Sequence, residues 1–141
     1  MIAGTVLHEG EAEGQLLVLQ EALSFWGGFD PQTGQIIDQH HPQAGANATG
    51  TLLALPGTRG SAGTPAGVAE AIRNGCGPAG IITAKKDINL LAGVMTAFQL
   101  YDICVPIVEI SRRELDTLTT GQRAQISGGH VTILPEQGPD S

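Results

Sequence analysis

Short apolar runs alternate with stretches of helical pattern in the second half of the chain, and this alternation limits the possible folds more than any other feature. The runs occupy residues 51–55, 79–83 and 105–109. The first is a short, continuous apolar run, which is typical of a strand covered on both faces of a sheet. Strands joined through helices run parallel, because each helix carries the chain back to the end of the sheet at which the previous strand began. We therefore expect a parallel α/β layer from residue 51 onward.

The helices between these runs carry recognisable start and stop signals. Thr64 followed by Pro65 fits an N-cap and a first helical residue, and the Asn74-Gly75 pair predicts the end of that helix. Asp87 fits the N-cap of a second helix. Apolar residues three or four positions apart predict the buried face of this second helix: Leu91, Val94, Met95 and Phe98.

The remaining segments have β and turn character. Four of them fit strands: residues 14–19, 35–38, 123–127 and 130–134. The Gly128-Gly129 pair predicts a hairpin between the last two, and Ser111 with Glu114 fits the capping box of a short third helix. We expect one α/β domain of β/β/α type over residues 1–135, in which the β-rich N-terminal half packs on the parallel α/β layer. Residues 136–141 are expected to form a flexible tail.

Composition excludes several classes of function. The chain has 141 residues and a formal charge of −7, with 14 acidic against 7 basic side chains, which disfavours nucleic acid as a partner. No run of about 18 apolar residues occurs, so we expect no membrane span, and the acidic start of the chain does not fit a signal peptide. Cys76 and Cys104 form no Cys-x-x-Cys pair and are too few for a four-ligand metal or cluster site. We expect a cytoplasmic protein with two buried, reduced cysteines and no metal of its own.

The loop of residues 57–63 is the strongest candidate for a functional site. It lies between a predicted strand and a predicted helix start, where free N–H groups and the positive end of the helix dipole favour an anion. Glycine at every third position allows a ligand to approach the backbone closely. Arg59 is the first Lys or Arg of the chain, although six acidic residues precede it, and a guanidinium binds a carboxylate through two parallel hydrogen bonds. A solvated glycine-rich connector is the alternative.

Two familiar loop types do not fit these residues. The Gly-Lys-Ser/Thr of a phosphate-binding P-loop is absent, and the glycine spacing differs from the dinucleotide fingerprint. Ser61 on a strand-to-helix turn resembles a hydrolase nucleophile, but Arg59 stands where that motif has glycine. Ser61 fits an acid–base role better, because an adjacent guanidinium and helix N–H groups would stabilise its alkoxide.

Several separated motifs resemble the small subunit, or swivel domain, of aconitase X. They occur in order over about residues 10–110, which is most of the chain, and include LPGTRGSAGT at 55–64, SFWGGFD at 24–30, TGQIID at 33–38 and YDICVP at 101–106. The resemblance implies a swivelling β/β/α fold docked on a large subunit that carries an iron–sulfur cluster, so that this chain binds no cofactor alone. It implies a hydro-lyase that dehydrates a small anionic hydroxy acid.

The resemblance also implies roles for individual residues. The serine that this family uses as proton acceptor falls on Ser61. Substrate binding then falls to Arg59, on chemical grounds, and to the neighbouring loop residues Thr58, Gly60, Gly63 and Thr64. Three further residues are candidates for the lining of the subunit cleft: Trp26, Gly27 and Asp30. The Gly-Thr-Arg-Gly-Ser motif at residues 57–61 favours cis-3-hydroxy-L-proline as substrate, with mevalonate 5-phosphate as the alternative.

Two non-catalytic functions stay open at this point. A swivelling phosphocarrier would be phosphorylated on a histidine, for which His40 and His41 are the candidates. A binding module would use the Arg59 loop without chemistry. Lys85, at the start of the second helix, is a conceivable second contact for an anion.

Overall fold

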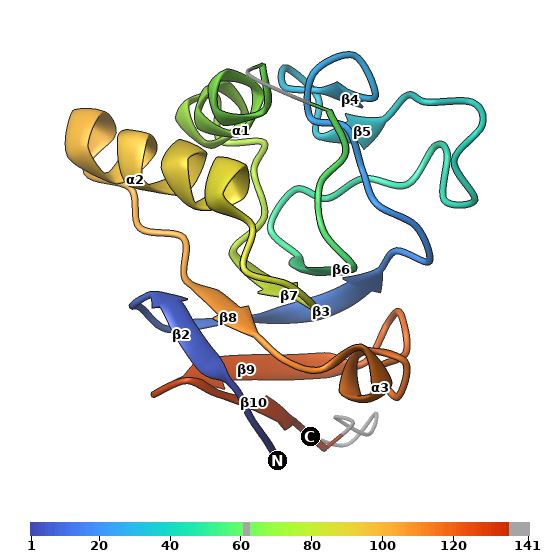
Figure 1. Cartoon of the computed structure of the whole chain (residues 1–141), viewed down its shortest axis with the longest axis vertical. Coiled ribbons are helices and arrows are strands. Elements are labelled where there is room, and N and C mark those ends of the chain that lie inside the picture. The colour runs from blue at the N-terminus through green and yellow to red at the C-terminus, as the bar shows by residue number, and fades with distance from the viewer. Residues whose placement is uncertain (61–62, 136–141) are drawn as a thin grey trace, which may run out of the picture.

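Three layers stack in the computed structural model, which describes residues 1–60 and 63–135 (Figure 1). Helices α1 and α2 form the first layer, a mainly parallel sheet forms the second, and an antiparallel sheet forms the third. The strands hydrogen-bond in the order β1-β10-β9-β3-β6-β7-β8-β2, and β3 belongs to both sheets. The expected β/β/α class is confirmed.

The middle layer contains the three predicted apolar runs. Its parallel strands are β3 (Ala12–Val18), β6 (Leu52–Leu55), β7 (Gly80–Thr83) and β8 (Ile107–Glu109). Every residue of β6 and β7 is buried, as expected for strands covered on both faces. Strand β2 (Thr5–His8) completes the edge and runs antiparallel to β8.

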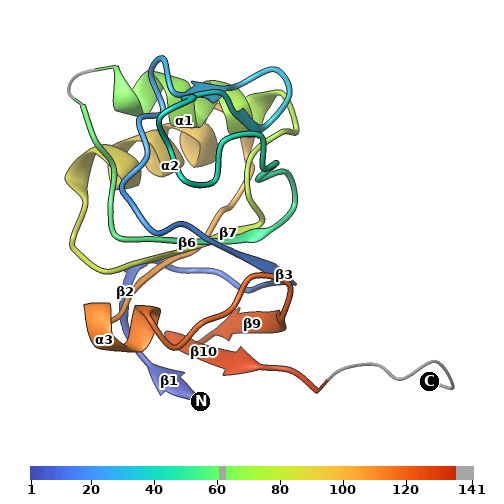
Figure 2. The same ribbon diagram turned by 90° about the vertical axis from the view of Figure 1, so that its right-hand side faces the viewer.

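The outer sheet combines the two ends of the chain. It contains β1 (Ile2–Ala3), β9 (Arg123–Ser127), β10 (His130–Ile133) and the first residues of β3. Gly128 and Gly129 have φ of 59° and 80°, the left-handed pair that a two-residue hairpin turn requires, so the predicted hairpin is confirmed. Figure 2 shows this sheet on the side of the middle layer that faces away from α1 and α2.

The N-terminal half contributes less to the outer sheet than we expected. Residues 20–51 lie instead on the helix side of the middle layer, where β4 (Phe29–Asp30) and β5 (Gln35–Ile36) form a separate small hairpin. Their apolar side chains join the core under the helices, in which Phe25, Phe29 and Ile36 pack in one cluster with Val68 and Ile72. A sequence of turns and short strands does not reveal which face of a sheet it covers.

Helix α1 (Thr64–Arg73) starts one residue earlier than predicted. Its N-cap is Gly63, which offers no side-chain cap, so Thr64 is a helical residue rather than the cap. The predicted end is right, because Asn74 is the C-cap and Gly75 follows with φ of 76°. The consequence is a helix start whose N–H groups are not capped by the residue before them.

Helix α2 (Ile88–Tyr101) is capped by Asp87 as predicted, but it is rotated about one residue from the predicted face. Its fully buried residues are Leu90, Gly93, Val94 and Ala97, whereas Met95 and Phe98 are 43% and 44% exposed. The small residue Gly93 explains the difference, because a Cβ there would lie 2.6 Å from the Val68 Cβ of α1. Close helix packing selects small side chains, which a pattern of large apolar residues misses.

Helix α3 (Arg112–Leu115) has the predicted capping box. The Ser111 hydroxyl accepts from the Glu114 N–H at 3.0 Å, and the Ser111 N–H donates to the Glu114 carboxylate at 3.1 Å. Leu115 then packs in the second core, between the two sheets. No helix in the part of the chain that the structure describes is long and apolar enough to cross a membrane.

Both cysteines are free thiols, but neither is fully buried as we expected. Cys104 is exposed and Cys76 is half-buried. The Cys76 thiol donates to the Gln32 carbonyl at 3.1 Å, and the Cys104 thiol donates to the Glu9 carbonyl at 3.2 Å. Each thiol therefore joins two surface segments instead of filling the core.

Candidate anion-binding site

The glycine-rich loop lies where two neighbouring parallel strands end. Strands β6 and β7 run side by side, so the residues that follow them meet at one edge of the sheet. The Thr58 N–H and hydroxyl both donate to the Asp87 Oδ2, at 2.7 and 2.6 Å, and the Asp87 Oδ1 accepts from the Leu90 N–H at 3.0 Å. One carboxylate therefore caps α2 and holds the loop.

The opposite side of the loop is bound to the segment that follows β3. The Leu23 N–H donates to the Gly57 carbonyl at 3.3 Å, and the Arg59 N–H donates to the Leu23 carbonyl at 2.9 Å. These bonds make an isolated parallel bridge between Leu23 and Thr58. Thr58 is thus fixed from both sides, by backbone on one and by the Asp87 carboxylate on the other.

Lys85 crosses the loop at Gly57. A Cβ at Gly57 would collide with the Lys85 Cε and would lie 3.1 Å from the Lys85 Nζ. Gly57 itself has φ of 154°, so the position excludes a side chain by backbone conformation as well as by space. The lysine stem therefore lies on the loop at Gly57, and Lys85 adds a second cationic side chain to the loop that carries Arg59.

Asp87 is ionised in this setting. The side chain is only 6% exposed, and burial alone would raise the pKa of the carboxyl. The hydrogen bonds from the Thr58 hydroxyl and N–H and from the Leu90 N–H, together with the Lys85 charge, outweigh burial and lower the pKa below its ordinary value. A stable carboxylate between Thr58 and α2 is the result.

Arg59 extends to solvent and makes one weak ion pair. Its Nη2 lies 3.3 Å from the Glu21 Oε1, and the two side chains are 53% and 52% exposed. The Glu21 carbonyl is held by the His41 Nε2 at 3.2 Å. An exposed pair with one contact contributes about 0.2–1 kcal/mol, so an incoming carboxylate can displace Glu21 and take both guanidinium N–H groups.

The start of α1 completes this part of the molecule. Gly60 has φ of 103°, and Gly63 caps the helix without a side chain. The Thr64 hydroxyl is buried and has no hydrogen-bond partner within the described residues. A buried unpaired hydroxyl costs roughly 1–3 kcal/mol, so a partner brought by a ligand or another chain would stabilise it. Ser61, the expected proton acceptor, lies outside the described residues, as does residue 62.

Trp26 packs on the loop from outside. A Cβ at Gly63 would lie 2.5 Å from the Trp26 Cγ, although the indole remains 67% exposed. Trp26 and Gly27 line a groove of about 290 Å³, together with Phe25, Phe29, Pro31, Ala66, Gly67 and Glu70. Asp30 is not part of this lining, because its carboxylate accepts the Gln32 N–H at 2.9 Å and closes a turn.

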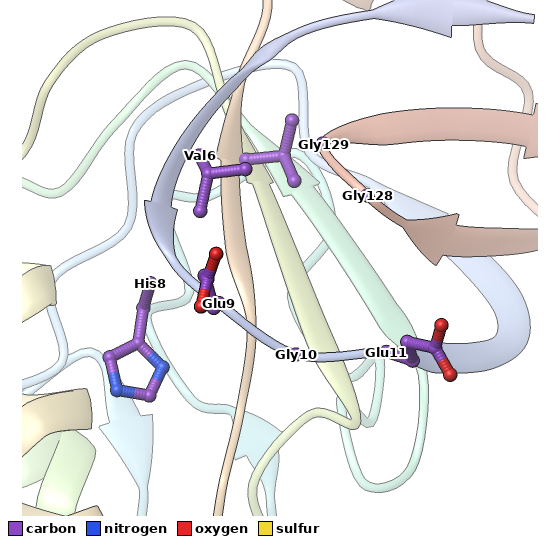
Figure 3. Close-up of a pocket in the computed structure, with 8 residues that line it drawn as sticks. Val6, His8, Glu9, Gly10, Glu11, Gly128 and Gly129 are labelled. Atoms are coloured by element: carbon purple, nitrogen blue, oxygen red, sulfur yellow. The ribbon is translucent and has the colours of Figure 1, made fainter.

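The other candidate residues lie elsewhere. His41 is 5% exposed, its Nδ1 accepts from the Gln43 N–H at 3.0 Å and its Nε2 faces the Glu21 carbonyl, so both ring nitrogens are engaged. A second cavity, of about 430 Å³, is lined by His8, Glu9 and Glu11 among others, and Figure 3 shows these side chains spread along the chain. No three His, Cys, Asp or Glu side chains gather as metal ligands in the described ranges 1–60 and 63–135.

Two residues of the site were not predicted as such. Asp87 was predicted only as a helix cap, although its position four residues after the end of β7, a strand parallel to β6, is the signal that places it beside the loop. Glu21 has no local signal, because its contact with Arg59 spans 38 residues of sequence. The predicted residues Thr58, Arg59 and Gly60 lie on one loop, with Gly63 and Thr64 at the helix start that follows it.

Comparison with known proteins gives one consistent family. The sequence profile of the aconitase X swivel domain matches residues 1–134. A cis-3-hydroxy-L-proline dehydratase of Pseudomonas aeruginosa is 35% identical over 139 residues, which are 99% of this chain and 24% of that protein. A phosphomevalonate dehydratase small subunit of Methanopyrus kandleri is 35% identical over 127 residues, which are 89% of this chain and 90% of that protein.

A solved structure supports the same comparison. The crystal structure of aconitase X from Thermococcus kodakaraensis, in its holo form, superposes with a TM-score of 0.85 at 28% identity, covering 95% of this chain and 98% of that chain. The present chain spans about a quarter of the length of the two cis-3-hydroxy-L-proline dehydratases that it matches, from P. aeruginosa and Hypocrea jecorina.

Proposed function

The chain belongs to the aconitase X swivel-domain family, and on that premise we propose that it is the small subunit of a hydro-lyase that dehydrates a small anionic hydroxy acid. The observation that supports this function best is that the loop of residues 57–63 is held at Thr58 from two sides. Thr58 is fixed between Leu23 and Asp87, and this fixes the backbone from which Arg59 reaches into solvent. A guanidinium on a rigid base next to an uncapped helix start suits the carboxylate of a substrate.

In this proposal the chain's own residues bind the substrate and move one proton. Arg59 exchanges Glu21 for the substrate carboxylate, and the first N–H groups of α1 add the positive end of the helix dipole. Ser61 accepts a proton from the substrate carbon, and the same positive groups stabilise its alkoxide. A serine hydroxyl is otherwise far too weak an acid for this role.

The proposal places the iron–sulfur cluster on the partner chain. The only cysteines of the chain are Cys76 and Cys104, which are too few for the usual ligands of a cluster. No three His, Cys, Asp or Glu side chains converge among the described residues, so these residues do not fit a cluster site. The cluster would supply Lewis-acid assistance to the departing hydroxyl group. The present chain would contribute the base and the anion site, so that neither subunit acts alone.

We propose cis-3-hydroxy-L-proline as the substrate and mevalonate 5-phosphate as the second candidate. The Gly-Thr-Arg-Gly-Ser motif of the loop supports cis-3-hydroxy-L-proline. The second is supported by the 90% coverage of an archaeal small subunit and by Lys85, whose ammonium group would suit a phosphate. Two relatives that act on different substrates are equally similar to this chain, at 35% identity.

Co-expression with a large-subunit homologue from the same genome tests the proposal. The purified pair is assayed anaerobically for dehydration of each compound, with each chain alone as control. We expect dehydration of cis-3-hydroxy-L-proline by the pair and by neither chain alone. A pair that assembles and dehydrates neither compound would overturn the proposal. Phosphohistidine at His40 on the isolated chain would instead favour a phosphocarrier, since both nitrogens of His41 are engaged.

A further inference from the structure

A single buried carboxylate connects the candidate loop to the start of helix α2. Asp87 receives two hydrogen bonds from Thr58, at 2.7 and 2.6 Å, and one from Leu90 at 3.0 Å. A helix cap needs only the bond from Leu90, so the contacts with Thr58 exceed what capping requires. The second oxygen of the carboxylate is therefore committed to the loop.

We propose that Asp87 is a positioning residue for substrate binding, which holds the Thr58–Arg59 backbone so that the Arg59 guanidinium meets the substrate anion. This inference rests on the proposed function. The Thr58 N–H and hydroxyl converge on the same Asp87 oxygen, which fixes both the backbone and the side-chain rotamer of Thr58. Arg59 follows directly, and its own N–H is bound to the Leu23 carbonyl at 2.9 Å.

Lys85 belongs to the same arrangement. Its stem lies on Gly57, and its charge contributes to the ionised state of Asp87. Asp87 is bound to Thr58, the residue before Arg59, and an unpaired carboxylate there could compete with the substrate for the guanidinium. Its engagement by Thr58, Leu90 and Lys85 leaves Asp87 as an anchor for the loop, and Glu21 is the carboxylate that pairs with Arg59.

Asp87→Asn is the first test. The asparagine oxygen can still cap α2 through the Leu90 N–H, but its amide nitrogen cannot accept from Thr58. In the assembled pair of subunits we expect KM for cis-3-hydroxy-L-proline to rise about tenfold, the size of one lost hydrogen bond to a charged group, with a smaller change in kcat. Partial unfolding would give the opposite pattern, because it removes active enzyme and lowers apparent kcat at constant KM.

Two further variants make the test specific. Thr58→Val removes the hydrogen bond from the Thr58 hydroxyl to Asp87 and leaves the cap of α2 intact. It therefore tests the contact between Thr58 and Asp87 even where Asp87→Asn folds poorly, and we expect KM to increase about three- to tenfold. Ser111→Ala removes the N-cap of α3, whose two bonds join Ser111 only to Glu114, and should leave KM unchanged. Equal KM changes in all three variants would overturn the positioning role.

Amide hydrogen exchange on the isolated full chain separates this inference from the proposed function. We expect Asp87→Asn to raise the exchange rate of the Thr58 amide at least about tenfold, and Ser111→Ala to leave it unchanged. Faster exchange with an unchanged KM would refute the positioning role and leave the proposed function intact. A wild-type pair of subunits that dehydrates neither substrate would refute both the proposed function and the positioning role. The exchange data would then still show that Asp87 holds the Thr58 amide.

Discussion

The ion pair between Arg59 and Glu21 offers the sharpest prediction about substrate binding. If Arg59 binds the substrate carboxylate, Glu21 competes with the substrate, and Glu21→Gln should lower KM. The pair is joined by one contact of 3.3 Å between side chains that are 53% and 52% exposed. Such a pair contributes about 0.2–1 kcal/mol, so its removal should lower KM by about 1.5- to fivefold.

The assay is the anaerobic dehydration rate of the assembled subunits as a function of substrate concentration. The decrease in KM should be largest at low ionic strength and should shrink as salt screens the exposed charges. Glu13→Gln is the matched control, because it breaks a pair of similar exposure with Arg123 in the outer sheet and changes the net charge equally. Arg59→Gln should raise KM at least about tenfold.

The result that would refute this reasoning is a KM that does not respond to Arg59. An unchanged KM in Arg59→Gln would show that the guanidinium does not meet the substrate. A decrease in KM of the same size in Glu21→Gln and Glu13→Gln would show a general effect of net charge, in which Glu21 has no particular role.

Three further predictions concern the framework of the site. Gly63→Ala should displace Trp26, the only tryptophan, since a Cβ would lie 2.5 Å from its Cγ; the emission maximum of intrinsic fluorescence should shift. Gly93→Ala should lower the free energy of unfolding by about 1–2 kcal/mol in urea titrations, because overpacking against Val68 costs more than the gain of up to about 1 kcal/mol in helix propensity. Asp87→Asn should lower the free energy of unfolding by about 1 kcal/mol at neutral pH. The ionised Asp87 carboxylate stabilises the folded protein, because its pKa is lower when folded than the value of about 3.9 expected when unfolded. This stabilisation is complete above that value and is lost as pH falls through the folded-state pKa, so the difference between variant and wild type should vanish on acidification.

Local signals in the sequence were sufficient for most of the framework. The Gly128-Gly129 turn, the capping box of Ser111 and the Asp87 cap are decided by a few adjacent residues, and all three are confirmed. The order of strands and helices also predicted the parallel layer, because crossover geometry leaves few alternatives.

Features that depend on distant contacts were less accessible. The buried face of α2 was misplaced because Gly93 packs on a helix 20 or more residues earlier, and small side chains carry little signal in a hydrophobic pattern. The same limit applies to the site. Thr58 and Arg59 were recognisable on their loop, whereas Asp87 and Glu21 are joined to them only by the fold.

The most direct test of the central claim is the dehydration rate of the assembled pair with Ser61→Ala. If this loop supplies the proton acceptor, the variant should assemble with its partner and bind substrate with a similar KM, while kcat falls by at least about 100-fold, the usual contribution of a general base. Full activity of Ser61→Ala in an assembled pair would contradict the claim that the loop of residues 57–63 is half of the active site.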